Sequence, residues 1–140
     1  MILIFFVSCN NIKDSKLFFT TGDVERCIDR GGDPNTRFAL FGNPKQEMTF
    51  LHFAVMEKDL ALIKKLIAVG ADPNALNSAG QTPLMTVFSE FKEIGDMVDI
   101  IDILAPITDL NIKDNLGEDV FDIIKMYWGD KWTVYLRRYS

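Results

Sequence analysis

The sequence predicts an all-α fold, a solenoid of about four stacked helix pairs with β-hairpin-like fingers between them and irregular first and last units. The motif Thr-Phe-Leu-His-Phe-Ala at residues 49–54 returns in part as Thr-Pro-Leu at residues 82–84, and this 33-residue step is typical of stacked repeats. The turn Asp-Pro-Asn occurs at residues 33–35 and again at 72–74. Between the motifs, apolar residues follow the spacing of helices that bury one face.

Composition is that of a folded chain of about one domain. The 140 residues are 48% hydrophobic and 25% charged, which is ordinary for a globular protein. The formal net charge is −5 and Lys and Arg form no extended cluster, so binding to nucleic acid is disfavoured. We expect a monomer that binds another protein, and the charge favours a basic partner.

The motifs divide the chain into predicted segments. Residues 1–8 are predicted as a signal-peptide remnant, 9–15 as a polar tether and 16–140 as the repeat domain, with units at about 16–35, 48–74, 81–111 and 118–140. The first unit has a short helix at residues 15–21 and a second helix from Gly22 that ends at Gly31 and Gly32. This second helix is about one turn shorter than its counterpart in the next unit.

The connection between the first two units is the longest finger. The step from Asn35 to Thr49 exceeds the matching step from Asn74 to Thr82 by 6 residues. The finger carries three large apolar side chains: Phe38, Leu40 and Phe41. They have two open destinations, either folded back onto the N-terminal segment or exposed as a patch for a partner.

The second unit is the most regular. Thr49 is predicted as the N-cap of its first helix. A stripe of apolar residues predicts the buried face of its second helix, which Gly70 ends: Leu60, Ile63, Leu66 and Ile67.

The third unit begins with Thr82 as the N-cap and Pro83 at the first helical position, where its missing N–H group costs nothing. It holds 4 extra residues within 88–94, and an additional helical turn is the simplest account. Its second helix restarts at residues 95–96 and ends at Pro106.

The fourth unit departs furthest from the repeat, although Asp119 keeps an oxygen acceptor at the N-cap. A final helix at residues 131–140 is predicted to cover the open end of the stack with Trp132, Tyr135, Leu136 and Tyr139.

The sequence contains no motif that indicates a catalytic site. His52 is the only histidine, so any Ser-His-Asp or Cys-His site would have to include it. The chain has no Gly-rich phosphate loop and no ligand-spaced pair of His or Cys residues. Asp96, Asp99 and Asp102 recur along one helix and predict a solvated face. We therefore predict no catalytic residue, no cofactor, no metal site and a protein that is not an enzyme.

The repeated unit resembles the ankyrin repeat, whose consensus begins Thr-Pro-Leu-His-x-Ala, although Met85 stands where the consensus has His. The resemblance implies that His52 hydrogen-bonds backbone between neighbouring units and that fingers and first helices form a concave strip that binds proteins. It places candidate partner-binding residues on the three fingers and the ends of the first helices: Phe38, Leu40, Phe41, Met56, Glu57, Leu76, Ser78, Ala79, Gln81, Glu90, Phe91, Lys113, Asn115, Leu116 and Glu118.

The N-terminus carries a second resemblance. Residues 2–7 form an apolar run too short to span a bilayer as a helix, and Phe-Val-Ser-Cys at residues 6–9 resembles the lipobox of bacterial lipoproteins. The resemblance implies a lipid on Cys9, a membrane anchor and a periplasmic location, although no Lys or Arg precedes the run. The other interpretation is an apolar cap on the repeat stack. Cys27 falls in a helical pattern and is expected in the core.

Together these features predict a non-catalytic protein-binding module, a secreted bacterial lipoprotein that inhibits a protein partner in the manner of an immunity protein. The alternative is a cytoplasmic ankyrin scaffold.

Overall fold

The computed structural model describes residues 20–93 and 95–140. Cys9, the apolar run before it and the predicted tether lie outside the described residues. The elements in chain order are α1 (Thr21–Asp29), β1 (Arg37–Ala39), η2 (Leu40–Gly42), η3 (Pro44–Gln46), β2 (Glu47–Thr49), α2 (Phe50–Met56), α3 (Leu60–Ala68), α4 (Pro83–Glu90), η4 (Gly95–Met97), α5 (Val98–Leu104), η5 (Ala105–Ile107), α6 (Val120–Tyr127), α7 (Asp130–Leu136) and η6 (Arg137–Tyr139).

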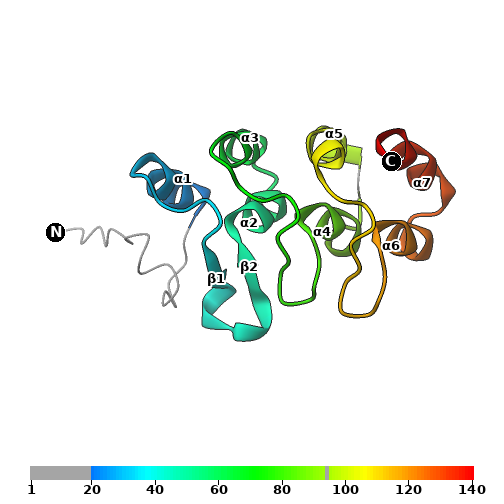
Figure 1. The fold of residues 1–140 in the computed structure, drawn as a ribbon, viewed down its shortest axis with the longest axis horizontal. Helices are drawn as coiled ribbons and strands as arrows, with labels where there is room; N and C mark the ends of the chain where they lie inside the picture. Colours follow the sequence, from blue (N-terminus) through cyan, green and yellow to red (C-terminus); the bar gives the residue numbers. More distant parts are fainter. Residues whose placement is uncertain (1–19, 94) are drawn as a thin grey trace.

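The helices form two rows that run along the length of the molecule (Figure 1). One row contains α2, α4 and α6 side by side, and the other contains α1, α3, α5 and α7, so that α2–α3, α4–α5 and α6–α7 are stacked pairs. The β1–β2 hairpin and the two connections that follow α3 and α5 project from the same side of the stack (Figure 1). This mostly helical architecture agrees with the predicted all-α class. No helix in residues 20–93 or 95–140 has the length and apolar character needed to cross a membrane.

The three helices of the first row begin at capping side chains. The hydroxyl of Thr49 accepts a hydrogen bond from the His52 amide at 3.5 Å, and the hydroxyl of Thr82 accepts one from the Met85 amide at 3.2 Å. Asp119 caps α6 by accepting from the backbone amides two and three residues later, at 2.9 and 3.0 Å. These contacts confirm the N-caps predicted from sequence, because each satisfies an amide that the first helical turn leaves without a partner.

The long finger folds as the β1–β2 hairpin, in which Phe38 faces Met48. Phe38 is 2% exposed, with its ring centroid 5.9 Å from that of Phe50 and 5.8 Å from that of Phe53. The prediction that Phe38 extends a binding edge is therefore wrong, because its strand turns this side chain into the stack, where burial stabilises it. Phe41, at the hairpin end, is 57% exposed.

The extra residues of the third unit do not lengthen its helix. The structure ends α4 at Glu90, and Phe91 has extended backbone angles. The carbonyl of Phe88 accepts a hydrogen bond from the indole Nε1 of Trp128 at 2.6 Å. In a longer helix this carbonyl would accept from a backbone amide four residues later. A non-helical segment therefore follows Glu90 in place of the expected additional turn. The indole of Trp128, which lies between α6 and α7, provides the hydrogen-bond donor for a carbonyl of the last turn of α4.

The final helix packs onto the end of the stack as predicted. Leu136 is fully buried, and the ring of Trp132 meets that of Phe88 at 6.2 Å with edge-to-face geometry. The hydroxyls of Tyr135 and Tyr139 donate to one oxygen of Asp102 at 2.5 and 2.8 Å. Asp102 is exposed, as the predicted solvated face requires, but it also accepts hydrogen bonds from the end of the chain, which the sequence did not predict. Cys27 lies in the core at 3% exposure, as expected.

Candidate functional site

The one histidine is a structural link between α2 and the connection after α3. His52 is fully buried, and its Nε2 lies 2.8 Å from the carbonyl oxygen of Gln81, which can only accept, so Nε2 carries the proton. Its Nδ1 lies 2.8 Å from the hydroxyl of Thr49. Burial lowers the pKa of His52 to about 4, so the ring is neutral near pH 7. Both ring nitrogens have partners, and the side chain has the backbone-bridging role that the sequence predicted.

Three projecting segments lie in a row beside the first-row helices. We call the hairpin at residues 37–49 finger 1, the connection at residues 74–81 finger 2 and the connection at residues 111–118 finger 3. Fingers 1 and 2 are joined through Ser78, whose amide donates to the carbonyl of Glu47 and whose hydroxyl donates to the carbonyl of Lys45, both at 2.8 Å. The predicted binding residue Ser78 therefore fixes the spacing of the first two fingers.

Fingers 2 and 3 are joined in a similar way. The backbone amide of Asn115 donates to the carbonyl of Ala79 at 3.0 Å, and the Asn115 side-chain amide donates to the carbonyl of Ser78 at 3.0 Å. Gly80 makes this approach feasible, because a Cβ atom there would lie 2.5 Å from Asn115 Oδ1 and its φ is +75°. The fingers are thus a connected series and present a fixed surface.

The two Asp-Pro-Asn turns and the Asp-Leu-Asn turn at residues 109–111 form a second connected series. The side-chain oxygen of Asn35 accepts from the amide of Asp72 at 2.7 Å, and that of Asn74 accepts from the amide of Asp109 at 2.8 Å. Each turn is thereby held to the next, a contact that the turn motif alone does not reveal. Together the two series make the arrangement of fingers and turns rigid.

A solvent-open hollow lies where fingers 1 and 2 meet α2 and α4. It has a volume of about 160 Å³ and brings together five of the predicted binding residues: Leu40, Met56, Ser78, Ala79 and Glu90. These residues come from η2, the end of α2, finger 2 and the end of α4. We call this space the hollow. Its lining mixes apolar side chains with polar and charged ones, a mixture that is common at protein–protein interfaces.

The hollow also contains residues that the sequence reasoning missed. Lys45, Gln46 and Glu47 of finger 1 and Thr86 of α4 line it as well. The repeat period was an available signal for finger 1, because Lys45 lies 33 residues before Ser78, to which it is hydrogen-bonded.

The remaining predicted binding residues lie outside the hollow, in two groups. Exposed side chains are those of Phe41, Glu57, Leu76, Lys113, Asn115 and Leu116. Gln81, Phe91 and Glu118 are half-buried, and two of them have structural partners. The side chain of Gln81 accepts from Ser89 at 3.0 Å, and the Phe91 ring lies 5.1 Å from the ammonium group of Lys58.

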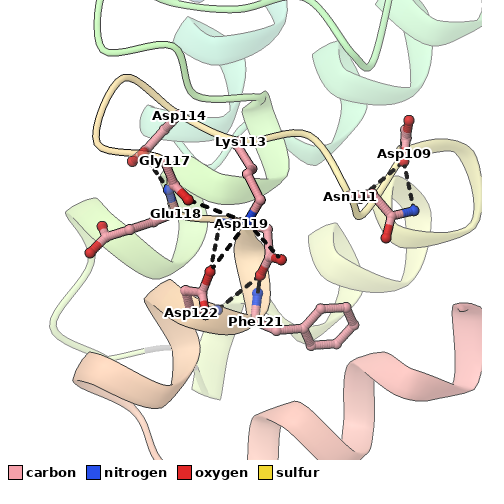
Figure 2. Close-up of polar contacts among 9 residues, drawn as sticks. All are labelled: Asp109, Asn111, Lys113, Asp114, Gly117, Glu118, Asp119, Phe121 and Asp122. Carbon is pink, nitrogen blue, oxygen red and sulfur yellow. Dashed lines mark hydrogen bonds and ion pairs between the residues drawn. The ribbon is translucent and has the colours of Figure 1, made fainter.

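Finger 3 and the start of α6 form an acidic cluster around one cation. The Lys113 ammonium group lies 3.6 Å from a carboxylate oxygen of Asp119 and 3.7 Å from one of Asp122. Figure 2 shows Lys113 between these residues, whereas the carboxylate of Glu118 points away from it. The cluster therefore keeps a negative balance, with three carboxylates to one ammonium group.

Comparison with known families supports the resemblance seen in the sequence. Residues 46–78 match the family model described as Ankyrin repeat. The matched segment runs from the end of finger 1 through α2 and α3 into finger 2. It includes three of the segments that line the hollow, namely finger 1, α2 and finger 2. A search among curated proteins finds no match to the chain. The ankyrin repeat indicates a protein–protein interaction module, a class that is typically non-catalytic.

Proposed function

We propose that this protein is a non-catalytic module that binds a folded protein partner, with the hollow as its principal contact. The observation that carries the proposal is the meeting of Leu40, Met56, Ser78 and Glu90, which come from four separate segments. Hydrogen bonds between fingers 1 and 2 fix the two segments that carry Leu40 and Ser78 before any partner arrives. A surface that is already ordered loses less conformational entropy on binding, which favours affinity.

The lining of the hollow suggests how a partner is held. Leu40 and Met56, both half-buried, offer apolar surface, and the flexible methionine side chain adapts to differently shaped occupants. At the rim, Glu90 is exposed and forms no ion pair with any residue in 20–93 or 95–140. An apolar side chain of the partner would fill the hollow, while a neighbouring Lys or Arg would approach Glu90. Such a combination of an apolar anchor and a peripheral charge is common at protein interfaces.

We further propose that the module acts in the bacterial periplasm, anchored by a lipid on Cys9, and that it inhibits its partner by occluding it, as an immunity protein does. The support is the sequence Phe-Val-Ser-Cys at residues 6–9, and the inhibitory role rests on analogy with small secreted binding modules.

The binding proposal is tested by a charge reversal at the rim of the hollow. The variant Glu90→Lys should lose capture of a stoichiometric protein partner from cell-envelope extract, because an approaching cation is then repelled. The matched control is Asp99→Lys, which makes the same change of net charge at an exposed position of α5, in the other row of helices. Both variants should have the circular dichroism spectrum of the wild type. Equal capture by both variants, or no stoichiometric partner for the wild type, would contradict the proposal.

The anchoring proposal is tested by the mass and labelling of the protein from its native cells. Metabolic labelling with palmitate should mark the wild type and fail to mark Cys9→Ser, since the lipid is attached to that thiol. Intact mass should show a mature chain that begins at Cys9. An unmodified Cys9 with Met1 retained would exclude the anchor and favour the cytoplasmic scaffold.

A further inference from the structure

We propose that finger 3 is a second contact surface and that it docks a basic segment of the protein partner through Leu116, backbone carbonyls and carboxylates. The inference rests on the proposed function in that the partner is a protein. It concerns a different surface from the hollow, since the hollow is lined by fingers 1 and 2, α2 and α4.

Leu116 projects from a turn that hydrogen bonds hold in place. One side-chain oxygen of Asp114 accepts from the amides of Leu116 and Glu118 at 2.9 and 3.0 Å, and the Asp114 carbonyl accepts from the amide of Gly117 at 3.0 Å. Asp114 is itself buried, at 9% exposure. Leu116 is 82% exposed at this ordered turn. A large apolar side chain on a fixed backbone can be buried by a partner at little conformational cost.

Finger 2 shows that the turn itself does not require leucine. There the side-chain oxygen of Asn77 accepts from the amides of Ala79 and Gln81 at 2.9 and 3.0 Å, which is the same pattern. Ala79 therefore occupies the position that corresponds to Leu116. The glycines that follow also correspond, with φ of +75° in finger 2 and +80° in finger 3. Two turns of the same form thus differ at the tip, and finger 3 alone carries a large exposed apolar group there.

The outer edge of finger 3 also presents hydrogen-bond acceptors. In finger 2, the carbonyls of Ser78 and Ala79 accept from Asn115 of the next finger. The corresponding carbonyls in finger 3 belong to Asn115 and Leu116, and neither accepts a hydrogen bond from residues 20–93 or 95–140. A partner segment that supplies N–H donors would continue the series by one step.

The carboxylates beside the tip of finger 3 favour a basic segment of the partner. Glu118, Asp119 and Asp122 lie beside the tip, and the cation Lys113 is already shared between Asp119 and Asp122 (Figure 2). The balance is negative, so Lys and Arg side chains are attracted and acidic segments are repelled. Exposed ion pairs contribute little affinity each, so the carboxylates provide selectivity while burial of Leu116 provides affinity.

The test uses a phage-displayed library of random peptides selected on the whole protein at low ionic strength. Recovered peptides should be rich in Lys or Arg next to a large apolar residue. A synthetic peptide of that sequence should bind Leu116→Ala roughly tenfold more weakly than the wild type. This variant gives finger 3 the tip of finger 2, and folding is not at risk because the side chain is 82% exposed. Glu118→Gln should weaken binding less, and added salt should reduce the difference.

The outcomes separate this inference from the proposed function. Peptides that lose binding with Glu90→Lys and keep it with Leu116→Ala would overturn the inference while supporting the hollow. Peptides without basic residues would also overturn it. If the wild type forms a dimer in sedimentation velocity and Leu116→Ala does not, finger 3 contacts a second copy of the chain and the inference is wrong. If no peptide is recovered, finger 3 does not dock such a segment and the inference is wrong. The capture experiment with Glu90→Lys still tests, independently, whether the hollow binds a protein partner.

Discussion

Neutral, buried His52 should make the stability of the fold depend on pH in a defined window. Burial lowers the pKa of His52 from 6.5 to about 4, so below pH 6.5 the unfolded chain binds a proton that the folded chain does not. The folded state therefore loses stability as the pH falls from about 6.5 towards 4, and the contribution is fully present above that window. Between about pH 7 and pH 5 the shift corresponds to a loss of about 2 kcal/mol in the free energy of unfolding.

The chain itself suggests the variant that isolates this group. Met85, 2% exposed, occupies the position of α4 that corresponds to His52 in α2, and its sulfur accepts from the amide of Thr82 at 3.5 Å. His52→Met should therefore fold. It removes the hydrogen bond from Nε2 of His52 to the Gln81 carbonyl, which keeps the hydrogen bond from the Asn77 amide at 2.9 Å, so the variant should lose about 1 kcal/mol at neutral pH. The variant should, however, lack the decline that protonation of the histidine causes.

The assay is urea-induced unfolding followed by circular dichroism at about pH 7 and about pH 5. Carboxylates titrate in both proteins and cancel in the comparison, and His52 is the only histidine in the sequence. Between pH 7 and pH 5, the free energy of unfolding of the wild type should fall by about 2 kcal/mol more than that of His52→Met. Equal losses in the two proteins, with unchanged dependence on urea concentration, would refute the reasoning.

Two further perturbations test the contacts that order the fingers and the final helix. Gly80→Ala should lower the free energy of unfolding by about 2 to 3 kcal/mol, because the added Cβ meets Asn115, whereas the control Gly117→Ala, at a similar φ with open space, should cost about 1 kcal/mol; equal losses would show that the close approach does not matter. Tyr135→Phe removes the donor that contributes most to lowering the pKa of Asp102, so that pKa should rise in a carbon-detected NMR titration, and an unchanged value would contradict the hydrogen bond.

Features set by neighbouring residues could be predicted from the sequence. Thr49, Thr82 and Asp119 act as N-caps because the accepting oxygen and the donating amides lie within three residues of each other. The apolar spacing predicted the buried face of α3 in part: Ile63 and Leu66 are buried as predicted and Leu62 is buried in addition, whereas Leu60 and Ile67 are half-buried.

Features set by distant partners could not be predicted. The end of α4 depends on Trp128, 40 residues after the carbonyl that it binds. Ser78 was expected at a binding surface because a polar fingertip residue has the same sequence appearance whether it meets solvent or a neighbouring finger. The inward turn of Phe38 depended on strand register, which reverses with a shift of one residue. The hollow could be found only once these long-range contacts were known.

We propose that the finger side of the stack, around the hollow, binds a protein. The most direct measurement is site-specific photo-crosslinking in living cells, with a photoreactive residue at Gln46, an exposed position that lines the hollow, and at Lys64, an exposed position of α3. If a partner binds at the hollow, position 46 should give one dominant crosslinked protein and position 64 none. Crosslinking of the same partner at both positions, or at position 64 alone, would contradict it.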